Sequence, residues 1–277
     1  MRIIDRRVSK IDGTVKLLFK ACDGAAAESV VLFNKGRATA CLSSQSGCAC
    51  ACAFCATGAL GFKRDLTPSE IIAQFTACLS EAGGELSSLV FMGMGEPFLN
   101  WENVKKGILT LSDQKGISFP QSRITVSTIG IVPVIEELAA SGLKINLAVS
   151  LVTSDARRRA DLVPMDKKYP LPEVLAACAR YCGSSGKAVF FEYILFEGIN
   201  DSPVDAEKLK ALVRDIDCKI NLIPYNKFPG KDLSPAGTKR NKEFQRILVT
   251  AGIRTHLRRE KGADIGAACG QLAAFRG

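Results

Sequence analysis

Apolar and polar positions follow two different patterns along this chain, and the first pattern gives way to the second near Pro68. Before it, three short apolar runs are separated by turn residues such as Asp23-Gly24, and they predict strands at Lys16–Phe19, Ser29–Phe33 and Arg37–Leu42. Thr67-Pro68-Ser69-Glu70 is typical of a helix start, with a capping Thr, Pro at the first helical position and Glu at the third. That helix is expected to run to about Glu81.

From there to residue 257, predicted strands and helices take turns. The predicted strands are Ser88–Met92, Ile124–Ser127, Lys144–Leu151, Ala188–Leu195, Lys219–Ile223 and Arg254–Leu257. The predicted helices are Trp101–Ser112, Val132–Ser141, Leu171–Gly183, Val204–Val213 and Lys239–Ala251. Such alternation indicates a parallel sheet with helices outside it. We expect an α/β fold, a partial, TIM-like (β/α)6 barrel, whose site lies on loops at the carboxyl ends of the strands.

The same pattern suggests three parts. They are a short N-terminal β extension over residues 1–40, the partial barrel over 41–258 and a Gly/Ala-rich C-terminal tail over 259–277. No internal repeat and no second domain are expected.

Composition narrows the class of protein. Of 277 residues, 47% are hydrophobic and 23% charged, which favours a globular chain. The sequence has no apolar run of the length that a membrane-spanning helix needs, and the N-terminus does not read as a signal peptide. Eleven cysteines without an export signal indicate a reducing compartment, so we expect a cytoplasmic protein. The net charge of +9 suits a polyanionic partner such as nucleic acid, but it also occurs in ordinary basic proteins.

The most informative stretch is the cysteine loop between residues 41 and 55. Cys48, Cys52 and Cys55 have the spacing C-x3-C-x2-C. Three thiolates can hold three irons of a [4Fe-4S] cluster and leave the fourth iron open for the amino and carboxylate groups of S-adenosylmethionine, as in radical-SAM enzymes. The alternative is a structural zinc site, which would need a fourth ligand. His256 is the only histidine and is distant in sequence, and Cys50 would require a sharp bend of the loop.

Several polar or small residues fall where predicted strands end. Gly93-Met94-Gly95-Glu96-Pro97 follows one strand directly, and its glycines would let the backbone approach a ligand while Glu96 accepts from an ammonium group. Ser127, Ser150 and Asn226 occupy similar positions. Each of these could also be an ordinary turn former.

Together these motifs resemble the RlmN-like radical-SAM RNA methyltransferases, which methylate C2 of an adenine in 23S rRNA and tRNA. The Cfr enzymes, which methylate C8, are close relatives. The resemblance runs from about Asp12-Gly13-Thr14 to the C-terminus, over segments 41–55, 93–100, 126–128, 162–169, 221–230 and 264–272.

The resemblance implies a role for individual residues. Cys48, Cys52 and Cys55 would hold the cluster. S-adenosylmethionine would be contacted by Gly95, Glu96, Ser127, Ser150, Leu151, Val152 and Asn226. Cys269 matches the cysteine that becomes S-methylated, Cys41 its resolving partner, and Glu28 a carboxylate proposed as proton acceptor.

The resemblance also implies how the reaction proceeds. Two molecules of S-adenosylmethionine would be used per turnover, one to methylate Cys269 and one to generate a radical. The carbon would reach the base through a covalent protein–RNA adduct, and Cys41 would release the product by forming a disulfide with Cys269. The implied partners are 23S rRNA or tRNA and an external electron donor such as flavodoxin, with the protein acting as a monomer. Candidate phosphate contacts are Arg157-Arg158-Arg159, Lys167-Lys168, Lys239-Arg240 and the group Arg254, Arg258, Arg259 and Lys261.

The sequence departs from the family in three places. Val152 stands where the family has His, Asp65 stands where it has Asn, and the chain begins near the point where the family's small helical N-terminal domain would end. The alternatives are therefore a C8 methyltransferase, a truncated paralogue with another substrate, and a non-catalytic RNA-binding or iron–sulfur protein. Intact Cys41, Cys269 and cluster cysteines argue against the last of these.

Overall fold

The computed structural model describes residues 1–273, and residues 274–277 of the expected tail lie outside the described residues. Its contacts divide the chain into two compact units. The first contains residues 1–51, 55–127 and the chain from Lys261 onward, and the second contains residues 52–54 and 128–260. Among the described residues, no helix combines the length and apolar character needed to cross a membrane.

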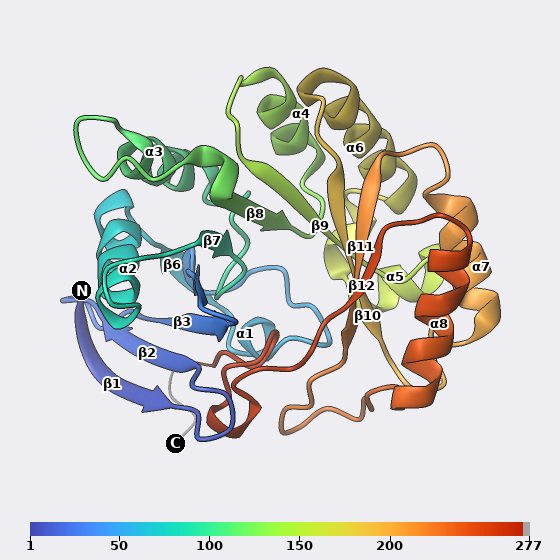
Figure 1. Ribbon diagram of the computed structural model, residues 1–277, viewed down its shortest axis with the longest axis horizontal. Helices are drawn as coiled ribbons and strands as arrows, with labels where there is room; N and C mark the ends of the chain where they lie inside the picture. Colours follow the sequence, from blue (N-terminus) through green and yellow to red (C-terminus); the bar gives the residue numbers. More distant parts are fainter. Residues whose placement is uncertain (274–277) are drawn as a thin grey trace. The chain divides into compact units, whose positions relative to one another are not determined.

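The first unit is built on a mixed sheet with strand order β1-β2-β3-β4-β7-β8 (Figure 1). Strands β1 (Arg2–Val8), β2 (Val15–Lys20), β3 (Ala26–Asn34) and β4 (Arg37–Cys41) pair in antiparallel fashion. Strands β7 (Ser88–Phe91) and β8 (Ile124–Thr128) continue the sheet in parallel with β4. A separate hairpin joins β5 (Gln45–Gly47) to β6 (Phe62–Asp65). The remaining elements of this unit are α1 (Ala56–Ala59), α2 (Pro68–Glu81), α3 (Trp101–Ser112), η1 (Gln121–Arg123) and η3 (Ala263–Ile265).

The start of α2 confirms the predicted cap. Thr67 Oγ1 accepts from the Glu70 N–H at 3.3 Å, and the Glu70 carboxylate accepts from the Thr67 N–H at 2.9 Å. Both halves of a capping box are therefore present, with Pro68 at the first helical position. The side chains of Ile71, Phe75 and Cys78 form the buried face of the helix.

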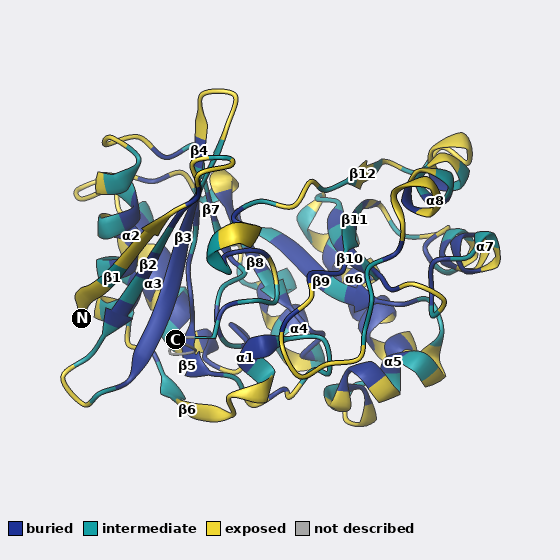
Figure 2. Cartoon of the chain, turned by 90° about the horizontal axis from the view of Figure 1, so that it is seen from below, coloured by how far each residue is buried: buried dark blue, intermediate teal, exposed yellow. Residues whose placement is uncertain are grey.

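Strand β3 is buried on both faces, as the dark ribbon of Figure 2 shows. Successive side chains of a strand point to opposite faces. Ser29 points to one face, where its hydroxyl donates to Gln74 of α2 at 2.7 Å. Ala26, Glu28 and Val30 point to the other, where they are covered by residues of the C-terminal segment, 261–273.

The C-terminal segment is anchored throughout. Gly262 N–H donates to the Asp12 carboxylate at 2.9 Å, and the Asp264 carboxylate accepts from the Ser9 hydroxyl at 2.7 Å. Ala267 and Leu272 are buried in one apolar cluster with Ala26, Val30 and Met94. Residues 261–273 of the expected Gly/Ala-rich tail thus have a defined course, because small residues pack closely against the sheet and their backbone groups find partners.

The second unit has a parallel sheet with strand order β9-β10-β11-β12. These strands are β9 (Asn146–Val152), β10 (Val189–Leu195), β11 (Cys218–Pro224) and β12 (Thr255–Leu257). Its helical elements are α4 (Val132–Ala140), α5 (Ala156–Leu162), η2 (Pro164–Lys167), α6 (Leu171–Ser185), α7 (Pro203–Leu212) and α8 (Thr238–Thr250). In Figure 2 these helices turn exposed residues away from the sheet, whose strands β9 and β10 are largely buried.

The predicted strands and helices are confirmed, with shifts of one to three residues at most ends. Strand β1, the β5–β6 hairpin, α1 and α5 were not predicted. Strand β1 was not predicted because almost all of its residues are exposed, so its sequence carries no alternation of apolar and polar positions.

Two glycines of the C-terminal segment provide a test of its close packing. Gly262 and Gly266 both have positive φ, 66° and 62°. A Cβ on Gly262 would lie 2.8 Å from Ala267 Cβ and from Thr14 Cγ2, whereas one on Gly266 would meet only Lys16 Nζ at 3.6 Å. Gly266→Ala should therefore cost about 1 kcal/mol of stability from backbone strain alone. Gly262→Ala should cost about 1–3 kcal/mol more, because it also overpacks.

Chemical denaturation of both variants, with amide hydrogen exchange over residues 267–273, would measure the difference. Equal destabilisation and equal exchange in the two variants would contradict the packing described for this segment.

Candidate active site

Several predicted site residues of the first unit lie at the carboxyl ends of three neighbouring parallel strands. Cys41 ends β4, Gly93–Glu96 follows β7, and Ser127 is near the end of β8. The structure thus brings these segments to one edge of the sheet, as parallel strands require.

The Gly93–Glu96 loop is joined to the chain that leads into the cysteine loop. Met94 N–H donates to Ser43 Oγ at 2.8 Å, and Glu96 N–H donates to Gln45 Oε1 at 2.9 Å. Both glycines are needed for this approach. A Cβ on Gly93 would lie 2.7 Å from Leu42 O, and one on Gly95, whose φ is +97°, would lie 2.5 Å from Gln45 Cβ.

Glu96 is buried, and its carboxylate accepts from Phe98 N–H at 3.0 Å. A hydrogen bond with the Cys50 side chain lowers the pKa of the nearby Cys48 thiol, and it outweighs burial and the charge of Glu96, which both raise that pKa. Burial raises the pKa of the Cys55 thiol, and the charge of Cys48 raises it further. Cys48 therefore lies within electrostatic range of both Cys55 and Glu96 in the first unit.

Cys50 is the cysteine of the loop that the structure buries, at 3% exposure, whereas Cys48, Cys52 and Cys55 are partly exposed. Within residues 1–273, no group of three His, Cys, Asp or Glu side chains is arranged as a ready metal site. The donor set of three thiols nevertheless fits an iron–sulfur cluster, because thiolates are its usual ligands and His256 belongs to another strand, β12.

Cys269 is exposed and lies on a tight turn of the C-terminal segment. Gln271 N–H donates to Ala268 O at 3.0 Å, and Gly270 has a φ of +83°, as the third position of a type II turn requires. The turn is fixed to α1 directly after Cys55. Ala56 N–H donates to Gly270 O at 2.8 Å, and the Thr57 hydroxyl donates to Leu272 O at 2.7 Å.

Glu28 and Cys41 occupy the sheet face on which this segment lies. Val30 is opposite Cys41 in the register of β3 and β4, and Cys41 packs against the cluster that contains Ala267 and Leu272. Glu28 is 4% exposed. One of its oxygens lies 3.1 Å from Lys16 Nζ, and the other accepts from Ala273 N–H at 2.9 Å. Lys16 Nζ also donates to Gly266 O at 3.3 Å, so it bridges Glu28 and the segment.

In the second unit, the predicted residues again lie at strand ends. Ser150, Leu151 and Val152 close β9, and Asn226 follows β11 and is buried. Tyr225 N–H donates to Leu195 O at 3.2 Å, which holds the chain before Asn226 beside the end of β10.

Sequence reasoning missed Glu192. It lies on β10 in register with Ser150 on one side and Asn221 on the other, so the three side chains share a face of the sheet. Asn221 Nδ2 donates to Glu192 Oε1 at 2.8 Å, and Arg258 Nη1 lies 3.6 Å from Oε2. Burial raises the pKa of Glu192, against the opposing effect of Arg258. The signal was a single acid within the apolar run of β10.

The structure changes the expectation for several of the arginines and lysines that were candidate phosphate contacts. Arg159 is fully buried, so the expectation that it contacts phosphate was wrong. Arg158 pairs with Asp205 at 2.8 Å, Arg254 pairs with Asp217, and Lys261 donates to Phe33 O. Among the candidates, Arg157, Lys167, Lys168, Lys239, Arg240 and Arg259 are exposed.

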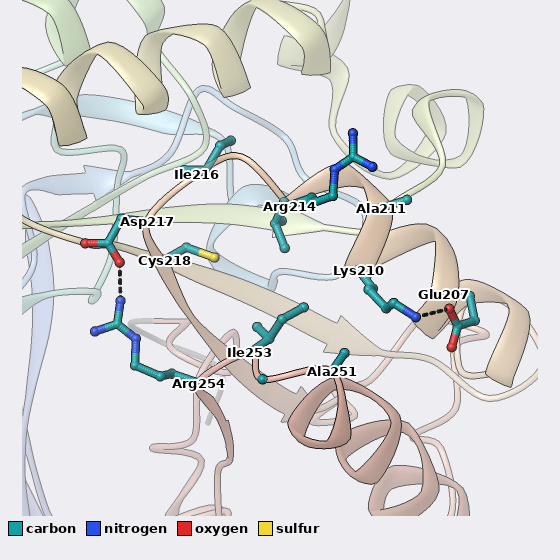
Figure 3. Close-up of a pocket in the computed structure, with 12 residues that line it drawn as sticks. Glu207, Lys210, Ala211, Arg214, Ile216, Asp217, Cys218, Ala251, Ile253 and Arg254 are labelled. Carbon is teal, nitrogen blue, oxygen red and sulfur yellow. Dashed lines mark hydrogen bonds and ion pairs between the residues drawn. The ribbon is translucent and has the colours of Figure 1, made fainter.

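A pocket of the second unit lies between α7, α8 and the starts of β11 and β12 (Figure 3). Its cations are matched by acids: Arg254 pairs with Asp217, and Lys210 pairs with Glu207 at 2.8 Å. Arg254, a candidate phosphate contact, lines it, but none of the expected cluster, cofactor or catalytic residues is among the described residues that do. The pocket lies at the starts of β11 and β12, whereas Asn226 follows the end of β11.

Comparisons with known proteins agree with this arrangement. The profile of the radical SAM superfamily matches residues 42–209. A probable dual-specificity RNA methyltransferase RlmN of Thermotoga petrophila is 45% identical over 272 residues, which cover 98% of this chain and 79% of the relative. A dual-specificity RNA methyltransferase RlmN of Syntrophobacter fumaroxidans is 43% identical over 268 residues, covering 96% and 78%.

A comparison with solved structures points to the same family. The crystal structure of a radical SAM methyltransferase from Sphaerobacter thermophilus superposes with a TM-score of 0.96 at 43% identity, and the match covers 99% of this chain and 81% of that one. The expected fold class, a partial radical-SAM barrel with an N-terminal β extension, is thereby confirmed. The chain belongs to the radical SAM superfamily and, within it, to the family of the RlmN RNA methyltransferases.

Proposed function

We propose that this protein methylates C2 of an adenine in RNA, in 23S rRNA, tRNA or both, with Cys269 as the carrier of the methyl carbon. The observation that carries this proposal is the position of the Cys269 turn. It is fixed to α1 directly after Cys55, and its segment covers the sheet face that bears Cys41 and Glu28. In our proposal, a carrier, a resolving thiol and a base belong to one site. The relatives named as dual-specificity RNA methyltransferases support RNA as the substrate.

The residues fit the cofactors that the superfamily uses. Cys48, Cys52 and Cys55 would hold a [4Fe-4S] cluster, and S-adenosylmethionine would be held by Gly95, Glu96, Ser127, Ser150, Leu151, Val152 and Asn226. Buried Glu96, at the end of the glycine loop and within electrostatic range of Cys48, suits the ammonium group of a cofactor bound at the open iron. When bound, these groups supply a methyl group in one step and a carbon-centred radical in another, with an external donor such as flavodoxin providing electrons.

Radical chemistry is required because C2 of adenine is electron-poor and does not attack a methyl cation. In our proposal the Cys269 sulfur first takes the methyl, forming an S–C bond. After one hydrogen atom is removed from that methyl, its carbon bonds to C2. Loss of the C2 hydrogen as a proton and an electron restores the aromatic ring. We assign the proton to Glu28, and the electron would be taken up by the oxidised cluster that Cys48, Cys52 and Cys55 would hold.

Cys41 then ends the covalent stage. Its thiolate attacks the Cys269 sulfur, so an S–S bond forms and the S–C bond breaks. The electron pair of that bond stays on the carbon, which takes a proton and becomes the methyl of the product. The disulfide must be reduced by an external dithiol before the next cycle.

Such a cycle needs a segment that docks firmly yet can move. Full burial of a side chain such as Leu272 contributes about 1.5–3 kcal/mol, and each hydrogen bond about 1 kcal/mol. Docking by two buried side chains and a few hydrogen bonds is therefore favourable, but its reversal is within the range of local opening.

The RNA would be held by exposed lysines and arginines, and the target base would be unstacked to reach the sulfur. An RNA substrate and the need for reduced thiols suit a cytoplasmic enzyme, and we propose that it acts as a monomer.

The ligand assignment makes a specific prediction about iron. In anaerobically reconstituted protein, Cys52→Ala should lose the cluster, because it removes one of only three ligands. Cys50→Ala should keep it, because Cys50 is buried and acts on Cys48 through a hydrogen bond, not as an assigned ligand. Iron analysis and the cluster's visible absorption would measure both. Loss of iron from Cys50→Ala with retention in Cys52→Ala would overturn the assignment.

The proposed role of Cys269 as methyl carrier makes a second prediction. RNA incubated with the reconstituted protein should yield 2-methyladenosine by nucleoside mass spectrometry, and Cys269→Ala should abolish it. Cys41→Ala should instead accumulate an RNA adduct that survives denaturation, since no thiol can then attack the Cys269 sulfur. A Cys41→Ala protein that releases methylated RNA at the normal rate would contradict the mechanism, and 8-methyladenosine as the sole product would contradict the proposed position.

A further inference from the structure

Strand β9 ends irregularly at the segment to which we assign a cofactor contact. Glu192 of β10 pairs with Ser150, but the next residue, Tyr193, pairs with Val152, so Leu151 is an extra residue in the ladder. Val152 has a φ of +70°, and Thr153 N–H donates to Leu151 O at 2.8 Å. The strand thus closes with a bulge and a tight three-residue turn centred on Val152.

This conformation is strained for the residue that adopts it. A β-branched side chain at positive φ is a rare arrangement that persists only when its surroundings impose it. Val152 is apolar and fully buried, so its side chain offers no polar group to a ligand. What the segment can offer a cofactor is therefore the Ser150 hydroxyl and the backbone, and both depend on the turn being held.

Two buried polar side chains hold it. The guanidinium of Arg159 donates to Leu151 O at 3.2 Å, to Ser150 O at 3.4 Å and, from the same nitrogen, to Ile129 O at 2.6 Å. Asp166 balances its charge. Arg159 reaches this place because Asp155 caps α5 and starts the helix directly after the turn.

Asn200 completes the arrangement. Its Nδ2 donates to Val152 O at 3.0 Å and to Ile194 O at 2.7 Å, and its Oδ1 accepts from Phe196 N–H at 2.9 Å. Three consecutive carbonyls, those of residues 150, 151 and 152, are thus drawn into the protein interior by Arg159 and Asn200. Because C=O and N–H of a peptide unit point in opposite directions, the N–H groups of Leu151 and Val152 are directed the other way.

We propose that Arg159 and Asn200 are positioning residues for S-adenosylmethionine, and that they act by imposing the strained end of β9. The inference rests on the proposed cofactor contact at Ser150–Val152. Neither side chain needs to touch the cofactor. With Val at position 152, cofactor binding at this segment depends on the backbone conformation that Arg159 and Asn200 fix.

The chain offers a matched control for Asn200. Asn241 of α8 is also a buried asparagine of the second unit, and its Nδ2 donates to a backbone carbonyl, that of Ala236, at 3.0 Å. That contact lies outside residues 150–152. Removing either amide deprives buried carbonyls of a donor, but only Asn200→Ala releases the turn.

The experiment measures S-adenosylmethionine binding by equilibrium dialysis on anaerobically reconstituted protein without RNA, with the melting temperature of each variant. Asn200→Ala should raise Kd about tenfold, which corresponds to about 1.4 kcal/mol. Asn241→Ala should leave Kd within about twofold at a similar loss of melting temperature. Arg159→Lys, which keeps the charge but loses the planar fork, should raise Kd as Asn200→Ala does.

Equal Kd values for Asn200→Ala and Asn241→Ala, or an unchanged Kd in Asn200→Ala, would overturn the inference even if Arg159→Lys fails to fold. Because no RNA is present, the result is separate from the proposed reaction. Protein that shows the expected Kd pattern but methylates no RNA would refute the proposed function and leave the positioning role standing.

Discussion

The burial of Glu28 beneath the C-terminal segment is the constraint on which the rest of the candidate site depends. A carboxylate can be buried at this depth only if its oxygens are matched. Lys16 provides the charge and Ala273 N–H the second hydrogen bond. Since Lys16 also reaches Gly266 O, matching the carboxylate fixes the segment at both ends of the Cys269 turn. The position of Cys269 thus follows from the electrostatics of Glu28, a residue of β3.

The two units solve the same problem by different means. Each must hold irregular backbone at the carboxyl ends of parallel strands, where we propose that the cofactor binds. In the first unit, glycines at positions 93 and 95 remove the Cβ atoms that would clash. In the second, a buried arginine and a buried asparagine hold a valine in a conformation that glycine would adopt without help. The first solution can be seen in a sequence, whereas the second needs coordinates.

Much of the fold and part of the site could be predicted from the residues alone. The cap at Thr67 and Glu70, the alternation of strands and helices, and the strand ends at Gly93–Glu96, Ser127 and Asn226 depend on local patterns, and they are where the sequence indicated. Docking of residues 261–273 could not be predicted, because Gly and Ala carry no periodic signal and the partners, Asp12, Lys16 and Glu28, are distant in sequence. Arg159 was misjudged for a similar reason: in a run of three arginines, only the tertiary structure tells which one turns inward.

The central claim is that Cys41 and the Cys269 turn share one site. It is tested most directly by brief anaerobic treatment of the reconstituted protein with a mild thiol oxidant, followed by non-reducing peptide mapping. A disulfide needs Cα atoms within about 4–7 Å, so its formation reports contact between the two segments. We expect a Cys41–Cys269 disulfide to accumulate before any disulfide with Cys22, which is exposed and belongs to the same unit. Preferential pairing of Cys269 with Cys22, or a Cys269 that stays reduced while other thiols pair, would contradict it.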